Sequence, residues 1–138
     1  YGELPGAARV ARLIKTGIQT KQISNSTLSL ADFLKKNVKH QRTMHPATLV
    51  FQSLRIAVND ELRGLDHFLE NAILKLSKGA RIVIITFQSL EDRIVKKWGT
   101  RHSSLLNAVT KKPILASPNE VKKNPRARSA KLRVYELI

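Results

Sequence analysis

Residues 81–97, RIVIITFQSLEDRIVKK, constrain the fold of this chain more than any other stretch. Ile82–Phe87 form a run of apolar and β-branched residues, which is typical of a strand buried on both faces of a parallel sheet. The run stops at Gln88, and the letters SLED at residues 89–92 fit a capping box that opens a helix. Ligands of open α/β sheets bind where such a strand ends and its helix begins, so we expect a functional site at this turn.

Helical periodicity predicts three helices upstream of the strand. Residues 7–19 place their apolar side chains on one face, and the letters SLAD at residues 29–32 fit a second capping box. Pro46 suits the first position of a long helix that runs to about Leu76, with Gly64 as its one weak point. Gly79 is expected to cap the C-terminus of this helix. A long helix that feeds a buried strand is half of a βαβ unit, which predicts the α/β fold class.

The C-terminal third is expected to hold two more helices and a strand. The first is the helix that follows the turn, from Leu90 to Trp98. The letters SPNE at residues 117–120 predict a short second helix, since serine suits the cap and proline the first turn. Residues 124–129 are interpreted as a loop, and residues 131–138 alternate as a final strand does.

The charge of the chain predicts a polyanionic partner. The sequence holds 25 basic and 10 acidic residues, for a formal net charge of +15. No apolar run approaches the roughly 20 residues needed to span a bilayer, so we expect nucleic acid and no membrane. The chain has no cysteine, which excludes disulfides and thiolate metal sites, and its four histidines lack a close ligand spacing. No metal site is therefore expected.

Three blocks of the sequence resemble one enzyme family. The blocks are HPATLVFQSLRIAVNDEL at residues 45–62, GARIVIITFQSLEDRIVKK at 79–97 and NPRARSAKLRVYEL at 124–137. Together, and in this order, they resemble the C-terminal half of the MraW/RsmH methyltransferases, and YGELPGAARVARLI at residues 1–14 looks like the helical segment that precedes them. The chain departs from the family pattern at Gln88, where the family usually has histidine, and at Leu49-Val50, where it tends to have a basic residue and threonine.

The resemblance implies a fold and an activity for a longer protein. It implies an enzyme that transfers a methyl group from S-adenosylmethionine to the N4 amino group of a cytidine in small-subunit ribosomal RNA, at the decoding centre. Residues 1–43 would be the later part of a helical substrate-recognition insert, and residues 44–138 the C-terminal part of a Rossmann-like catalytic domain. The chain starts at Tyr1 and its one methionine is Met44, so we expect an upstream segment. The resemblance implies that this segment carries the S-adenosylmethionine site.

The residues expected to act are polar groups at strand ends and cations along the rim of a cleft. Four cations within eight residues, at 126, 128, 131 and 133, suit a phosphate track. The basic run at residues 35–42 is left open between a solvated face and an RNA contact, and Trp98 is expected to pack against the sheet. No catalytic base is assigned. The residues predicted to bind RNA are His45, Arg55, Asn59, Gln88, Ser89, Arg93, Lys96, Arg126, Arg128, Ser129, Lys131 and Arg133.

Two hypotheses of different classes follow. In the first, the chain is part of an active methyltransferase, which the three blocks that resemble the family favour. In the second, it is part of an inactive relative that binds ribosomal RNA as an assembly factor of the small subunit, which Gln88 and the lack of a Gly-rich loop favour. A stand-alone basic RNA-binding module is disfavoured, because the Ile82 strand would lack neighbours. The expected partners are small-subunit ribosomal RNA, the assembling subunit and its assembly factors, in the bacterial cytoplasm or, for an organellar source, the mitochondrial or plastid matrix.

Overall fold

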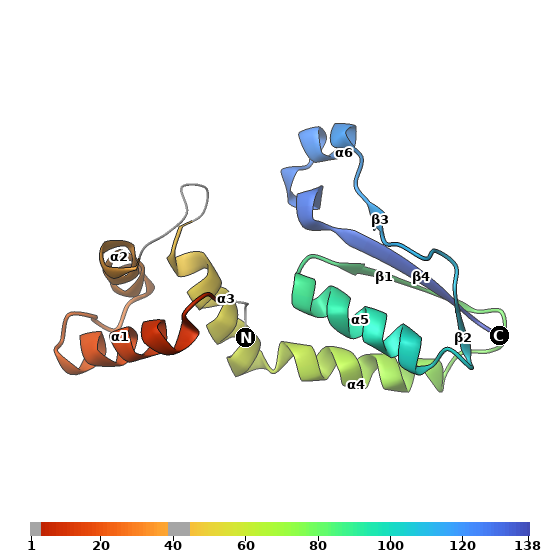
Figure 1. Ribbon diagram of the computed structural model, residues 1–138, viewed down its shortest axis with the longest axis horizontal. Helices are drawn as coiled ribbons and strands as arrows, with labels where there is room; N and C mark the ends of the chain where they lie inside the picture. The colour runs from red at the N-terminus through yellow and green to blue at the C-terminus, as the bar shows by residue number, and fades with distance from the viewer. Residues whose placement is uncertain (1–3, 39–44) are drawn as a thin grey trace. The chain divides into compact units, whose positions relative to one another are not determined.

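The computed structural model describes residues 4–38 and 45–138, which divide into two compact units (Figure 1). The first unit lies within Tyr1–Asp60 and the second is Glu61–Ile138. The two units are described separately below. The assignment of residues 1–43 to a helical insert and of residues 44–138 to a catalytic domain stays a prediction.

The first unit consists of three helices, α1 (Ala7–Gln19), α2 (Thr27–Asn37) and α3 (Ala47–Asn59). The bounds of α1 are those that its periodicity predicts. The start of α2 was predicted wrongly: Ser26, and not Ser29, accepts the capping hydrogen bond, from the Ser29 N–H at 3.1 Å. The helices share a small core of buried apolar side chains. Its buried members are Val10, Leu34, Ala47 and Val50.

The long helix predicted from Pro46 to Leu76 is two helices, because the chain turns at Asp60. Asp60 adopts the left-handed conformation (φ 52°, ψ 38°), so α3 ends at Asn59 and α4 (Glu61–Ile73) begins a new helix. A short polar side chain tolerates this conformation, which a β-branched or bulky residue does not. Gly64, the expected weak point, lies inside α4. Gly79 is also not the cap of α4: it has φ 83° in the turn before the strand, and its N–H donates to the Leu137 carbonyl at 2.7 Å.

The second unit packs α4 and a second helix on one face of a small sheet (Figure 1). After β1 (Arg81–Thr86) come α5 (Ser89–Arg101), β2 (Leu106–Ala108), β3 (Ile114–Leu115), α6 (Pro118–Lys123), the 3-10 helix η1 (Pro125–Ser129) and β4 (Lys131–Leu137). The strands are ordered β1-β4-β2, and β3 also pairs with β4. All described pairings are antiparallel. The α/β fold class is confirmed, while the parallel neighbour expected for the Ile82 strand is absent from the described residues.

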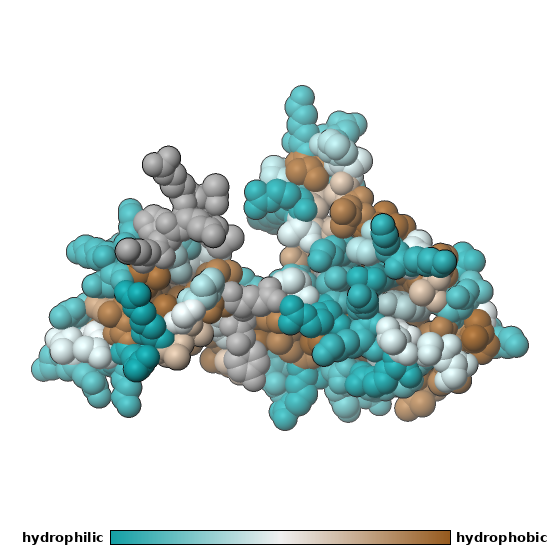
Figure 2. All heavy atoms as spheres, viewed as in Figure 1, coloured by the Kyte–Doolittle hydropathy of each residue, from teal (hydrophilic) through white to brown (hydrophobic). Residues whose placement is uncertain are grey.

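The predicted burial of β1 on both faces is wrong for the described residues. Ile82, Ile84 and Thr86 point to the helices, whereas Val83 and Ile85 alternate with them and keep 58% and 55% of their surface exposed. An antiparallel sheet needs only one covered face, and no described element of this unit covers the other. Figure 2 shows hydrophobic residues reaching the surface of this unit among hydrophilic ones.

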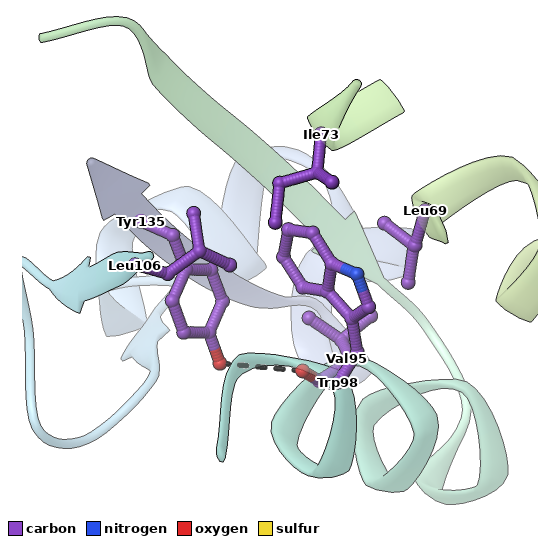
Figure 3. Close-up of a cluster of buried hydrophobic side chains, with 6 residues drawn as sticks. All are labelled: Leu69, Ile73, Val95, Trp98, Leu106 and Tyr135. Carbon is purple, nitrogen blue, oxygen red and sulfur yellow. Dashed lines mark hydrogen bonds between the residues drawn. The ribbon is translucent and has the colours of Figure 1, made fainter. Parts of the chain in front are cut away.

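The core of the second unit forms where α4, α5 and the sheet meet (Figure 3). Trp98 of α5 is fully buried and meets the Tyr135 ring edge-on, with centroids 5.4 Å apart. The Tyr135 hydroxyl donates to the Val95 carbonyl at 3.3 Å, and Gly99 leaves the room in which the Tyr135 ring lies. The expectation that Trp98 packs against the sheet is therefore confirmed. The remaining buried members are Leu69, Ile73 and Leu106.

Candidate nucleic-acid interface

The turn after β1 is fixed by the first residues of α5. The Glu91 carboxylate accepts hydrogen bonds from the N–H groups of Phe87 and Gln88, at 3.0 and 3.2 Å. Gln88 is the N-cap, so the capping box joins Gln88 and Glu91, one residue before the predicted box of Ser89 and Asp92. Glu91 thus serves the backbone of the turn, which holds Gln88 and Ser89 at the carboxyl end of the strand.

Asp92, which was predicted to belong to the capping box, instead joins α5 to β4 through an ion pair. Its carboxylate accepts from Arg133 Nε at 2.7 Å and from Arg133 Nη2 at 3.2 Å, and Lys131 Nζ lies 3.4 Å away. The Asp92 and Arg133 side chains are only 12% and 11% exposed. The hydrogen bond from Arg133 holds the pKa of Asp92 below its usual value, and the same bond raises the pKa of Arg133. This pair is a buried, bidentate ion pair between two elements.

This pairing separates the four cations of the predicted phosphate track into two groups. Arg133 is nearly buried and forms an ion pair with Asp92. Lys131 also contacts Asp92, but its side chain is partly exposed to solvent. Arg126 and Arg128 are exposed on η1, on either side of Ala127, which is buried. The Ala127 N–H donates to the Asn124 carbonyl at 2.9 Å, which fixes the turn that presents both guanidinium groups.

The register of the sheet brings the two ends of the candidate site together. Thr86, the last residue of β1, is paired with Lys131, the first residue of β4, and the Thr86 hydroxyl donates to the Lys131 carbonyl at 3.4 Å. Gln88 and Ser89 follow Thr86, and η1 with Arg126 and Arg128 precedes Lys131. Six predicted RNA contacts therefore lie at the carboxyl end of β1. They are Gln88, Ser89, Arg126, Arg128, Ser129 and Lys131.

The other predicted contacts lie elsewhere. Arg93 and Lys96 are exposed along α5, next to Lys97 and Arg101 in an open depression. His45, Arg55 and Asn59 belong to the first unit. The N-cap of α3 is Pro46, which was predicted at the first helical position. His45 Nδ1 accepts from the Ala47 N–H at 3.2 Å, and Arg55 and Asn59 are exposed on α3. Of the basic run at residues 35–42, residues 39–42 lie outside the described residues.

Two features of the site were not found from the sequence. One is the pairing of Asp92 with Arg133, which strand alternation would have indicated, because residues 131, 133 and 135 share the face of β4 that meets α5. The other joins the second half of α5 to α4: Arg101 Nη2 donates to Asp66 and Glu70, each at 2.8 Å, and His102 Nε2 lies 2.8 Å from Glu70.

The turn after β1 lacks the Gly-rich loop that cradles a dinucleotide cofactor. Dinucleotide-binding Rossmann folds hold their cofactor on a Gly-rich turn and an acidic residue that binds the ribose. The strand-to-helix turn at residues 86–89 has no glycine, and its nearest acids, Glu91 and Asp92, are engaged with backbone N–H groups and with Arg133. Within residues 4–38 and 45–138, no group of three His, Cys, Asp or Glu side chains is placed to hold a metal ion, and no helix is long and apolar enough to cross a bilayer.

Comparison with known proteins gives one consistent result. The family described as "MraW methylase family" matches residues 1–138. A relative from Nostoc sp. (strain PCC 7120) is 48% identical over 134 residues, or 95% of this chain and 44% of its own length. One from Acaryochloris marina is 49% identical over 138 residues, or 100% of this chain and 46% of its own length. Both are named ribosomal RNA small subunit methyltransferase H. The chain thus spans about half the length of the curated relatives it matches.

Proposed function

The chain belongs to the MraW methylase family, and we propose on this basis that it is part of a methyltransferase that acts on small-subunit ribosomal RNA. The proposed reaction transfers a methyl group from S-adenosylmethionine to the N4 amino group of a cytidine at the decoding centre. The observation that carries the proposal is the group of polar and cationic side chains at the carboxyl end of β1, where α/β enzymes bind their ligands. The cofactor itself is proposed to bind outside this chain, which alone is expected to be inactive.

The proposed role of this chain is to hold the RNA. Arg126 and Arg128 are exposed and can each bind a phosphate with two parallel hydrogen bonds. The Gln88 side-chain oxygen accepts from the Glu91 N–H in the capping box, so the amide NH2 of Gln88 is the group proposed to orient the nucleotide. A glutamine cannot carry a proton, so Gln88 is not proposed to act as a base. Methyl transfer to an amino nitrogen depends on alignment and on exclusion of water, which positioning residues supply. Arg133 is left out of this role, because its guanidinium is occupied by Asp92.

Titration of the full-length protein with S-adenosylmethionine by calorimetry tests the enzymatic proposal. We expect measurable heat of binding, and we expect transfer of labelled methyl groups to small-subunit ribosomal RNA. Digestion of the labelled RNA to nucleosides identifies the modified position, and a label on any base other than cytidine contradicts the proposed target. Absence of cofactor binding, together with retained RNA binding, would favour the alternative of an inactive assembly factor.

The cellular location is proposed from the source of the relatives. The relatives are bacterial, so we place the protein in the bacterial cytoplasm, with the mitochondrial or plastid matrix as the alternative for an organellar source. The proposed partners are small-subunit ribosomal RNA and the assembling small subunit with its assembly factors.

A further inference from the structure

The segment between β3 and β4 is a small lobe that carries mostly positive charge. This basic lobe, residues 117–130, consists of α6 and η1, which Figure 1 shows beyond the end of the sheet. It contains four cations and a single acid, Glu120. Figure 2 shows hydrophilic residues over this end of the unit. The four cations are Lys122, Lys123, Arg126 and Arg128.

The basic lobe is held in place by specific backbone contacts. Ser117 caps α6 by accepting from the Glu120 N–H at 3.1 Å, and Pro118 occupies the first turn. The Asn124 N–H donates to the Glu120 carbonyl at 2.7 Å, and the Asn124 carbonyl accepts from Ala127 at 2.9 Å. Asn124 therefore joins the last turn of α6 to the first turn of η1. The cations are presented by ordered turns, which lowers the entropy lost when they bind a partner.

The contacts that hold the fold together do not account for the presence of two adjacent lysines in α6. Lys122 and Lys123 are exposed, and within the described residues neither takes part in an ion pair or a side-chain hydrogen bond. A lysine in the last turn of a helix compensates the helix dipole and stabilises the helix by about 0.3–1 kcal/mol. This stabilisation falls off within one turn, and a single lysine supplies it, so it does not explain a cluster of cations. Four cations in seven residues instead repel one another, a cost that a bound polyanion removes.

The position of the basic lobe connects it to the candidate site. Residues 122 and 128 are six residues apart, so their Cα atoms are separated by less than about 20 Å even for an extended chain. The lobe leads directly into Lys131, which pairs with Thr86 at the end of β1. Lys122 and Lys123 therefore lie close enough to Arg126 and Arg128 for the four cations to contact neighbouring phosphates of one RNA segment.

We infer that Lys122 and Lys123 of α6 form a second phosphate-binding element, which grips the RNA backbone next to the nucleotide held at the carboxyl end of β1. This inference rests on the proposed function, since it takes the partner to be small-subunit ribosomal RNA. An acidic protein is the other polyanion that fits a basic surface. RNA is favoured because the same lobe holds Arg126 and Arg128 of the predicted phosphate track, whose forked donors match phosphate.

The test is the salt dependence of RNA binding by the full-length protein and its variant Lys122→Gln/Lys123→Gln. Each phosphate contact contributes about 0.7–0.9 to the slope of log affinity against log salt, so the variant is expected to lose about 1.5 from this slope and roughly tenfold in affinity at 0.15 M salt. Lys75→Gln/Lys78→Gln is the matched control, because both lysines are exposed before the opposite end of β1. Circular dichroism of each variant confirms that its fold is kept.

The outcomes separate the two proposals. One outcome refutes the role of Lys122 and Lys123 and leaves the proposed function standing: the wild-type protein binds small-subunit ribosomal RNA, and the slope of Lys122→Gln/Lys123→Gln changes no more than that of the control. If the wild-type protein binds no ribosomal RNA, the proposed function fails and the inference fails with it. Poly-L-glutamate tests the acidic-protein alternative: a variant that loses affinity for this polymer but not for RNA overturns the assignment.

Discussion

The ion pair of Asp92 with Arg133 gives the sharpest prediction, because a single substitution leaves a buried charge without its partner. Asp92→Asn keeps the size of the side chain but removes the negative charge that Arg133 contacts at 2.7 and 3.2 Å. Lys131, 3.4 Å from the same carboxylate, can turn to solvent, whereas Arg133 is enclosed between β4 and α5. The cost of the substitution therefore falls mainly on Arg133.

The magnitude follows from the burial of the pair. Removal of one partner of a fully buried pair costs about 3–5 kcal/mol. Both side chains here keep about a tenth of their surface exposed, which lets water solvate part of the orphaned charge, so we expect about 2–4 kcal/mol. At about 1.4 kcal/mol for each factor of ten, the equilibrium for opening of this region would rise by about 30- to 700-fold.

Hydrogen–deuterium exchange of the full-length protein measures this change locally. Peptides from Lys131–Leu137 and from the start of α5 should lose protection in Asp92→Asn, while peptides from α1 should keep theirs. A double-mutant cycle with Arg133→Gln isolates the pairwise energy, since the double variant buries neither charge. A coupling energy below about 0.5 kcal/mol would show that the pair does not hold α5 to β4.

The same pair predicts how stability changes with acid. The hydrogen bond from Arg133 lowers the pKa of Asp92 from its usual 3.8, so the folded state favours the ionised carboxylate. The stabilisation is then fully present above pH 3.8 and is lost as the pH falls through the lower, folded-state pKa. The difference in protection between wild type and Asp92→Asn should shrink below pH 3.8. A difference that stays constant through this range would contradict the assignment of the lowered pKa to this ion pair.

Two further predictions concern packing and RNA binding. Gly99→Ala should destabilise the second unit by about 1–3 kcal/mol in urea unfolding, because a Cβ at Gly99 would collide with the Tyr135 ring. Gly64→Ala is the contrasting substitution: its added Cβ meets nothing within 4 Å, so it should stabilise α4 by about 0.5–1 kcal/mol. Equal effects of the two substitutions would contradict the close approach of α5 to β4. Arg126→Ala/Arg128→Ala should weaken binding of ribosomal RNA and lower the salt slope by about 1.5; an unchanged slope in filter-binding measurements would remove η1 from the phosphate track.

Much of the candidate site could be predicted from the sequence, because the relevant signals are local. The periodicity of α1, the serine cap of α6, the strand at Lys131–Leu137 and the turn after Thr86 all depend on neighbouring residues. The resemblance to the MraW/RsmH family, which the comparisons confirm, depends on three local blocks in order. Some errors lie at element ends: the capping box after β1 begins one residue earlier than predicted, and α2 begins three residues earlier. Two larger errors are the division of the long helix at Asp60 and the exposed face of β1.

The amino-acid sequence by itself determined most of the helices, the strands β1 and β4, the excess of positive charge and the family. Only the tertiary structure decided which charges remain available to a partner, because pairing depends on residues that are about 40 positions apart in the chain. Arg133 and Arg128 look equivalent as letters, yet the register of β4 against β1 and α5 buries the first on Asp92 and leaves the second in solvent. The sign of a charge is a local property, but its exposure is set by packing.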